Sequence, residues 1–167
     1  MWIGLKCGLK FMLNLNRILE EIKTLPKWDE QICLQGTKTI KDPFAGIGKA
    51  IDLPEKEIEF TYPLFDIPYI NSIIKEHDLY RVRLMNLKRK TCYTYHRDQG
   101  KRFHIPIITN ENCFFIVDEE LIRYPADGNY YIVNTSKKHT AINASREDRI
   151  HLIGNIKKKD NSWGILL

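Results

Sequence analysis

Apolar and polar residues alternate along most of the C-terminal half of the chain. The first run with this period of two is Tyr80–Leu87, and it is rich in β-branched and other apolar residues. Such alternation is typical of strands with one face in a core. The later runs with the same pattern are Thr91–His96, Phe103–Ile108, Cys113–Val117, Tyr130–Asn134 and Arg149–Ile153. Turn residues separate these short runs, so we predict an antiparallel β-sandwich or barrel.

The N-terminal half has a helical pattern instead. Apolar residues recur at three- and four-residue intervals from Ile18 to Leu25. This spacing predicts a helix that Asn16 caps and Pro26 ends. A second helix is predicted over Ile67–Glu76. The fold class is therefore mainly β with an N-terminal α part.

A chain of 167 residues is long enough for one domain of ordinary size. We expect a single domain over residues 1–167, in which residues 1–79 form helical support and loops. Residues 80–156 form the β core and carry the site. A short strand is expected near Gln31–Leu34, ahead of Gly- and Pro-rich loops over residues 36–66.

The apolar N-terminal segment does not have the pattern of a signal peptide or a membrane span. Lys6 and Lys10 interrupt it, and no A-x-A-like cleavage site follows. Nowhere does the chain contain the roughly 20 consecutive apolar residues that cross a bilayer. Two interpretations of residues 1–11 remain: Met12 is the native start, or the segment packs on the core.

Charge and cysteine usage narrow the class of protein further. The net charge is +5, and the basic clusters at residues 88–90 and 157–159 have only three residues each. We interpret them as solvated loops, which argues against a nucleic-acid partner. The four cysteines form no C-x-x-C pair, so we expect reduced thiols and a cytoplasmic location. They are Cys7, Cys33, Cys92 and Cys113.

The first candidate for chemistry is a metal site. His96 and Asp98 lie where a predicted strand runs into the turn at Gly100. Residues two apart share a face of a strand, so this imidazole and this carboxylate can aim at one point. With His139 as a third ligand they would form the facial triad of non-haem Fe(II) oxygenases, which leaves positions open for a co-substrate and O₂. The alternative is a solvated His–Asp pair at a turn.

A second candidate is Arg149, which lies ten residues after His139 and begins the apolar run RIHLIGNI. A guanidinium that points into an apolar barrel is destabilising unless it meets an anion. Its planar fork matches a carboxylate, and a dicarboxylate co-substrate would satisfy it. An ion pair with Glu147 or Asp148 is the alternative.

These residues lie in a stretch that resembles a known family. The segments RVRLMNL, YTYHRDQGKRFHIPIITN and GNYYIVNTSKKHTAINASREDRIHLIGNI are similar to the aspartyl/asparaginyl β-hydroxylase-like branch of the Fe(II)/2-oxoglutarate-dependent oxygenases. The resemblance covers residues 80–156. Its parts are the HxD motif, the strand Arg102–Pro106, the distal His-Thr pair and the arginine ten residues later. It implies a double-stranded β-helix, which is a cupin-like jelly roll.

The resemblance also implies roles for particular residues. His96, Asp98 and His139 would hold Fe(II). Arg149 would bind the distal carboxylate of 2-oxoglutarate, and His104 would help to bind that co-substrate. The animal endoplasmic-reticulum enzymes of this group lack the carboxylate ligand. The chain is therefore more similar to the compact bacterial and phage members, which include proline hydroxylases.

The implied reaction is the hydroxylation of an aspartyl/asparaginyl or prolyl-type residue, or of a free amino acid, with release of succinate and CO₂. The alternatives are a metal-dependent cupin enzyme without 2-oxoglutarate and a non-catalytic cupin-like binding module.

A candidate substrate residue is Arg83. It shares a strand face with Arg81, so one of them could contact a substrate carboxylate; the alternative is that this strand face is exposed. The expected partner is an amino-acid, peptide or protein substrate. No membrane partner is expected, and the sequence does not predict the oligomeric state.

Overall fold

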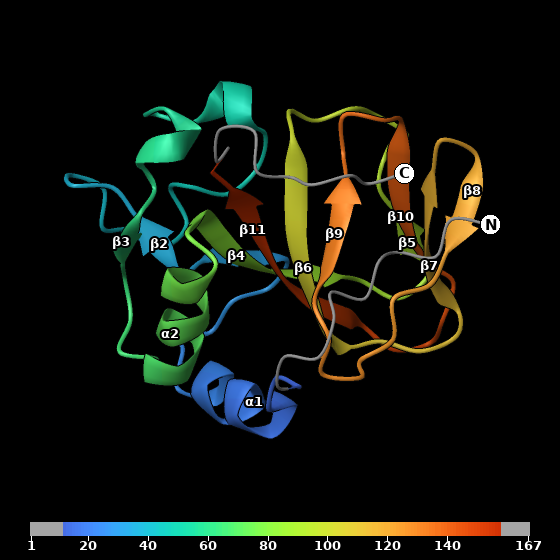
Figure 1. The fold of residues 1–167 in the computed structure, drawn as a ribbon, viewed down its shortest axis with the longest axis horizontal. Coiled ribbons are helices and arrows are strands. Elements are labelled where there is room, and N and C mark those ends of the chain that lie inside the picture. The colour runs from blue at the N-terminus through green and yellow to red at the C-terminus, as the bar shows by residue number, and fades with distance from the viewer. Residues whose placement is uncertain (1–11, 158–167) are drawn as a thin grey trace.

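The computed structural model describes residues 12–157. The N-terminal segment 1–11 and the last two lysines of the second basic cluster lie outside the described residues. The fold is a sandwich of two antiparallel sheets (Figure 1). It confirms the predicted jelly roll with an N-terminal helical part.

The major sheet has five strands and the minor sheet has four. In spatial order, the major sheet consists of β1 (Gln31–Cys33), β4 (Leu79–Leu87), β11 (Arg149–Ile156), β6 (Lys101–Ile108) and β9 (Tyr131–Asn134). The minor sheet consists of β5 (Thr91–Cys92), β10 (His139–Asn143), β7 (Cys113–Val117) and β8 (Glu120–Ile122). The remaining elements are the pair β2 (Gln35–Gly36) and β3 (Tyr62–Pro63), the 3₁₀ turns η1 (Ala50–Asp52) and η2 (Glu57–Glu59), and the helices α1 (Leu15–Lys23) and α2 (Pro68–Glu76).

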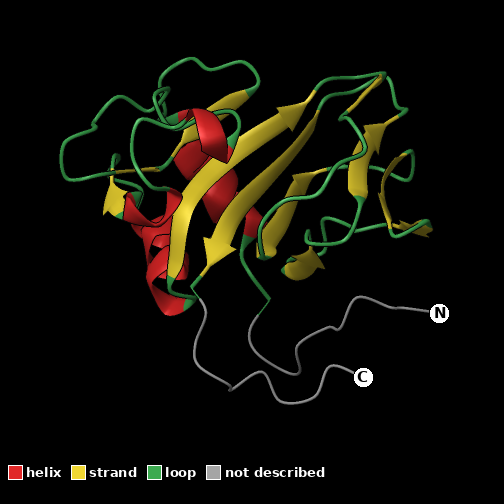
Figure 2. Ribbon diagram, turned by 90° about the horizontal axis from the view of Figure 1, so that it is seen from above, coloured by secondary structure: helices red, strands yellow, loops and turns green. Residues whose placement is uncertain are grey.

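Both helices cover the outer face of the major sheet, on the side away from the minor sheet (Figure 2). Apolar residues of the helices and of alternate strand positions are fully buried between them, among them Ile18, Ile70, Leu84, Ile105 and Leu152. The other strand positions point between the two sheets. On β6 and β11 the inward positions include the buried polar side chains of Arg102, His104, Arg149 and His151, so the candidate site lies inside the barrel and the larger apolar cluster lies outside it.

Several predicted boundaries were wrong. The N-cap of α1 is Asn14, because its side chain accepts a hydrogen bond from Arg17 N and the helix begins at Leu15. The expected strand Thr91–His96 forms a continuous strand only at its first two residues, because the carbonyl of Tyr93 accepts the hydroxyl of Thr140; His96 pairs again with His139 in an isolated bridge. The expected strand Arg149–Ile153 extends to Ile156.

Two strands of the minor sheet, β8 and β10, are absent from the sequence-based expectation. Four of the five residues of β10 are buried, with no alternation, and β8 is short and exposed at two of its three positions. Neither has the period of two on which the prediction relied. The described cysteines, Cys33, Cys92 and Cys113, are free thiols as expected. Each described α-helix has nine residues, too few to cross a membrane.

Candidate active site

Two imidazoles and one carboxylate converge at one end of the sandwich. The potential ligand atoms of His96, Asp98 and His139 all lie within 4.8 Å of one another. Asp98 Oδ2 is 3.7 Å from His96 Nε2 and 3.8 Å from His139 Nε2. The three predicted ligands are therefore brought together, although 41 residues separate the last two along the chain.

The backbone holds both imidazoles in the orientation that a metal site requires. His96 and His139 form an isolated β-bridge with two backbone hydrogen bonds, of 3.0 and 2.8 Å. His96 Nδ1 lies 2.6 Å from the carbonyl of Thr94, and His139 Nδ1 lies 3.0 Å from the carbonyl of Lys137. A ring whose Nδ1–H donates to a carbonyl presents an unprotonated Nε2 as a ligand.

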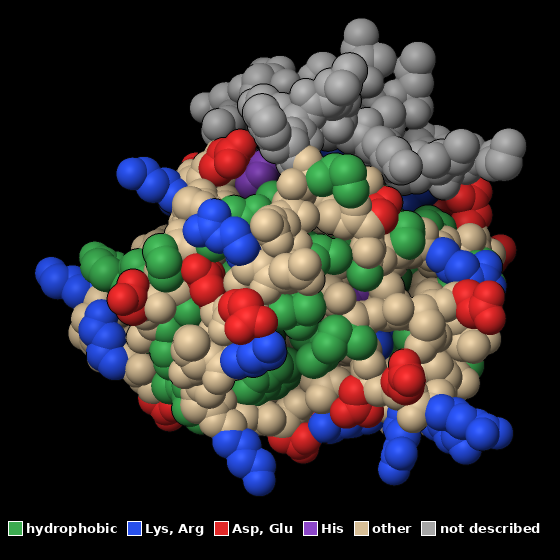
Figure 3. Space-filling view, turned by 90° about the horizontal axis from the view of Figure 1, so that it is seen from below, with side chains coloured by type: hydrophobic (Ala, Val, Ile, Leu, Met, Phe, Trp, Pro, Cys, Tyr) green, Lys and Arg blue, Asp and Glu red, His purple; other side chains and the backbone are tan. Residues whose placement is uncertain are grey.

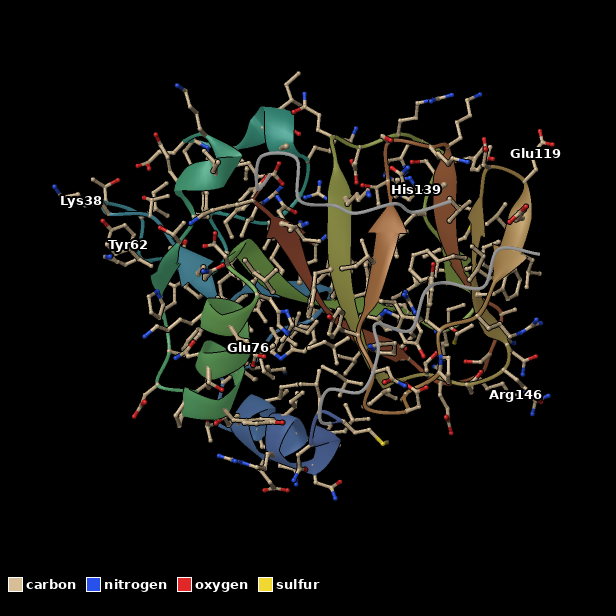
Figure 4. The ribbon with its side chains drawn as sticks, in the orientation of Figure 1. Lys38, Tyr62, Glu76, Glu119, His139 and Arg146 are labelled. Atoms are coloured by element: carbon tan, nitrogen blue, oxygen red, sulfur yellow. The ribbon has the colours of Figure 1, made fainter. Side chains whose placement is uncertain are left out.

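Burial and exposure differ within the triad. Burial lowers the pKa of His139, which favours the neutral, metal-binding form of its ring. His96 and Asp98 are more than a third exposed. Figure 4 shows His139 at the upper end of the sandwich, whereas Arg146, in the turn before β11, lies at the opposite end. The triad is thus reachable from one end of the barrel.

Arg149 lies deeper, at the start of β11, and is 3% exposed. Its Nε is 3.0 Å from His151 Nε2, and its guanidinium carbon lies 4.8 Å from the centre of the Phe115 ring. Burial lowers the pKa of Arg149 to about 10. No described carboxylate forms an ion pair with it, and Asp148 instead accepts from Lys88 and Arg89 N. The guanidinium is thus positioned for an anion that the chain does not supply.

A buried imidazole lies near both Arg149 and His139. His104 is 3% exposed, and neither of its ring nitrogens has a hydrogen-bond partner among the described residues. Burial, followed by the positive charges of Arg149 and Arg102, lowers its pKa well below the usual value. The ring is therefore neutral near pH 7. An unpartnered polar group in a protein interior is destabilising, which points to a ligand at this position.

Four arginines surround this interior. Arg102 Nη2 is 3.6 Å from Asp98 Oδ2. Glu57 accepts from Arg81 Nη1 at 2.5 Å and from Arg102 Nη1 at 3.0 Å. Burial raises the pKa of Glu57, but the charges of Arg102 and Arg81 outweigh it and hold the pKa below its usual value. Arg83, the predicted substrate residue, is also buried and donates to Gln31 Oε1 at 3.1 Å. The alternative prediction, that Arg83 lies on an exposed strand face, is therefore wrong.

Comparison with known proteins identifies the family. A model of the aspartyl/asparaginyl β-hydroxylase family matches residues 13–159. The chain belongs to the aspartyl/asparaginyl β-hydroxylase family. The match includes the triad, Arg149 and the N-terminal helices, and so extends the resemblance beyond residues 80–156. Among curated proteins, none matches the chain.

Several solved structures are similar to parts of this β-hydroxylase family member. A cupin domain from Bordetella pertussis has 18% identity and a TM-score of 0.41, covering 47% of this chain and 81% of its own. A predicted oxalate decarboxylase from Thermotoga maritima has 12% identity and a TM-score of 0.41, covering 52% and 73%. The plu4264 protein from Photorhabdus luminescens has 18% identity and a TM-score of 0.39. That match covers 46% of this chain and 62% of the Photorhabdus protein, less than two thirds of it.

The rule that residues two apart share a strand face did not identify two residues near the triad of this hydroxylase-family chain. Arg102 contacts Asp98, and Glu57 contacts Arg102. Arg102 lies two residues before His104, so the same parity could have placed both on the inner face. Glu57 lies in a 3₁₀ turn within the loops 36–66 and had no recognisable signal. It reaches the barrel only because the chain folds back over β4.

We expect Glu57→Ala to destabilise the fold strongly. The substitution leaves the buried guanidiniums of Arg81 and Arg102 without their shared carboxylate, a change that typically lowers the free energy of unfolding by about 3–5 kcal/mol. Chemical denaturation of this variant and of its control measures the free energy of unfolding. The matched control is Glu59→Ala, an exposed carboxylate two residues away, for which a change below about 0.5 kcal/mol is expected. Equal effects of the two substitutions contradict the proposed pairing.

The buried histidines predict acid-sensitive stability. Burial holds the pKa of His151 and of His104 well below 6.5 in the folded chain, whereas the unfolded chain takes up protons near pH 6.5. The resulting stabilisation is complete above pH 6.5. It decreases as the pH falls toward the folded-state pKa, by up to about 1.4 kcal/mol per pH unit for each ring.

Thermal unfolding between pH 7.5 and 5 measures this dependence. A chelator is included so that loss of metal does not contribute. We expect the double variant His104→Asn/His151→Asn to have a flatter pH profile than the unmodified chain. An equally steep profile contradicts the assignment to these two rings.

Proposed function

We propose that the protein is an Fe(II)- and 2-oxoglutarate-dependent dioxygenase that hydroxylates an amino-acid substrate. Candidate substrates are an aspartyl/asparaginyl or prolyl-type residue, or a free amino acid, with release of succinate and CO₂. The observation that carries the proposal is that the triad and Arg149, which has no carboxylate partner, share one barrel interior. Family membership supports hydroxylase activity.

The donor set fits ferrous iron. Two neutral imidazoles and one carboxylate on one side of a metal are the ligands of non-haem Fe(II) oxygenases. His96, Asp98 and His139 would hold the ion, with Nε2 of each ring directed to it by the Nδ1–carbonyl contacts. Bound Fe(II), with 2-oxoglutarate and O₂, supplies the oxidising power that converts a substrate C–H bond to C–OH.

The chain's own residues would bind and orient the co-substrate. Arg149 would pair with its distal carboxylate through two N–H groups, while the Phe115 ring restricts the guanidinium. His104, neutral and without a partner, would donate a hydrogen bond to a co-substrate oxygen nearer the triad. A metal-dependent cupin enzyme without a dicarboxylate co-substrate would leave Arg149 buried without an anion.

The end of the sandwich opposite the triad has a mixed surface. On the face shown in Figure 3, basic and acidic side chains are interspersed among apolar and neutral ones. A nucleic-acid backbone is bound by a basic stripe or patch, so this distribution does not favour nucleic-acid binding on that face.

Succinate formation tests the proposal. The full chain is incubated in air with Fe(II), ascorbate and 2-oxoglutarate, alone and with free amino acids or short peptides, and succinate is measured by NMR. We expect slow formation without substrate and faster formation with one of the compounds, both dependent on Fe(II). No succinate under any condition contradicts the proposal, and O₂ consumption without 2-oxoglutarate would support the cupin alternative.

A further inference from the structure

We propose that Glu57 is a positioning residue of the metal site: it draws Arg102 away from Asp98, so that the Asp98 carboxylate stays free to bind the ion. This inference rests on the proposed function and adds to it a residue outside the ligand set. Three ion-pair contacts support it. They join Glu57 to Arg81 and to Arg102, and Arg102 to Asp98.

The carboxylate of Asp98 is not fixed by hydrogen bonds. Its backbone is held, because Asp98 N donates to the carbonyl of Thr135 at 2.8 Å. Among the described residues, the side chain has only longer contacts. Its Oδ2 lies 3.6 Å from Arg102 Nη2, 3.7 Å from His96 Nε2 and 3.8 Å from His139 Nε2. The carboxylate oxygens are thus available to a metal ion, and Arg102 is the permanent cation that can compete for them.

Arg102 contacts two carboxylates and lies closer to Glu57. Its Nη1 is 3.0 Å from Glu57 Oε1, which is a hydrogen bond, whereas the 3.6 Å between Nη2 and Asp98 Oδ2 is too long for one. A guanidinium can bind a carboxylate through two parallel hydrogen bonds. The Arg102 side chain is only 7% exposed, so water would replace a lost carboxylate poorly. Without the charge of Glu57, Arg102 would therefore pair with Asp98 and compete with the ion.

Arg81 sets the position of Glu57. Its Nη1 donates to Glu57 Oε1 at 2.5 Å, and its Nε and Nη2 donate to the carbonyls of Gly46 and Gly48 at 3.1 and 2.7 Å. The Arg81 side chain is itself almost fully buried. The loop that carries Glu57 is thus fastened to the barrel by contacts that do not involve the triad.

Charge gives the effect its sign. A divalent ion adds two positive charges to a site that already has Arg102 beside it. Burial raises the pKa of Glu57, but the charges of Arg102 and Arg81 outweigh it, so the carboxylate is negative near pH 7. This negative charge offsets that of Arg102 and lessens its repulsion of the ion. Loss of the charge should therefore weaken metal binding, although Glu57 is not one of the three ligands.

The coupling is reciprocal. A metal ion on Asp98 repels Arg102 and strengthens its pairing with Glu57, by the same factor by which that pairing strengthens metal binding. The amide hydrogens of the loop over residues 44–59 should therefore exchange more slowly when metal is bound. A carboxylate that only stabilised the fold would not transmit this response through Arg102.

The metal affinity of a charge-neutral variant tests the proposal. Glu57→Gln keeps the size of the side chain and a hydrogen-bonding oxygen and removes the charge. Anaerobic equilibrium dialysis of the full chain gives the Fe(II) dissociation constant. We expect it to rise about 10–100-fold, as is typical for loss of an outer-shell partner of a metal ligand. The matched control, Glu59→Gln, removes an exposed carboxylate two residues away and should leave the constant unchanged.

A second variant distinguishes positioning from a structural role. Glu57→Gln/Arg102→Gln also removes the competing cation, so we expect it to bind Fe(II) about tenfold more tightly than Glu57→Gln alone. If Glu57→Gln weakened binding through damage to the fold, the added substitution would give no such recovery. Circular dichroism checks that each variant is folded.

Hydrogen exchange measures the coupling in the unmodified chain, and so decides even where Glu57→Gln does not fold. We expect Zn(II) to slow exchange in peptides that cover residues 44–59, and this protection to be lost in Arg102→Gln. Peptides from helix α2 should not respond.

Three outcomes overturn the proposal: normal Fe(II) affinity in Glu57→Gln, no tighter binding in the double variant than in Glu57→Gln, or no protection of residues 44–59 by bound Zn(II). If the unmodified chain binds neither metal, the proposed function fails instead.

Discussion

Asp98→Ala is expected to abolish metal-dependent turnover. Asp98 is the one carboxylate of the triad, and its Oδ2 lies within 4 Å of both imidazoles. Loss of an outer-shell partner of a metal ligand typically lowers activity about 10–100-fold. We therefore expect removal of a ligand itself to lower the rate of succinate formation at least about 1,000-fold.

Two measurements show whether this loss arises at the metal. Anaerobic equilibrium dialysis should show greatly weakened Fe(II) binding, while circular dichroism stays unchanged because Asp98 N keeps its backbone bond to the carbonyl of Thr135. Glu119→Ala, at an exposed turn away from His139 in Figure 4, is the control and should bind Fe(II) normally. Normal iron affinity in Asp98→Ala would remove Asp98 from the ligand set.

Arg149→Gln is expected to weaken 2-oxoglutarate binding and leave Fe(II) binding intact. Removing one partner of a buried charge pair typically weakens binding by about 2–5 kcal/mol, or roughly 30- to 5,000-fold. The dissociation constant for 2-oxoglutarate is measured for each Fe(II)-loaded variant in the absence of O₂. The exposed Arg146→Gln, three residues away, is the matched control.

The free energy of unfolding of Arg149→Gln distinguishes a role in co-substrate binding from a role in packing. In the chain without co-substrate, the Arg149 guanidinium is buried and makes no ion pair with a described residue. The guanidinium also contacts the buried ring of His151, so we expect Arg149→Gln to lower the free energy of unfolding of the ligand-free chain by no more than about 1–3 kcal/mol. A large destabilisation without co-substrate, together with unchanged 2-oxoglutarate affinity, would identify Arg149 as a packing residue.

The sequence could predict the site because its residues have local patterns. The HxD spacing puts His96 and Asp98 close together, and Arg149 begins a recognisable apolar strand. The β-bridge that joins His96 to His139 is a contact between distant segments, which no local pattern specifies. His139 was a candidate third ligand from its residue type and position, the resemblance to the family supported it, and the structure confirms that the three residues converge.

Other parts of the site depend on tertiary contacts alone. Glu57 and the carbonyls of Gly46 and Gly48 belong to irregular loops, whose course is set by the side chains they cover. Strand parity placed Arg81 and Arg83 on one face. The positive φ of Arg81 interrupts that alternation, yet both side chains donate to the carbonyl of Gly48, a contact that the sequence does not specify. The minor strand β10 carries no alternation, so its pairing with β7 was equally invisible in the sequence.

The central claim is that one barrel interior holds both Fe(II) and 2-oxoglutarate. Anaerobic visible absorption of the full chain with Fe(II), before and after addition of 2-oxoglutarate, tests it most directly. A keto acid chelated to ferrous iron gives a weak metal-to-ligand charge-transfer band. We predict that this band appears, is lost in Asp98→Ala and is weakened in Arg149→Gln. Binding of Fe(II) with no band after addition of 2-oxoglutarate would contradict the claim.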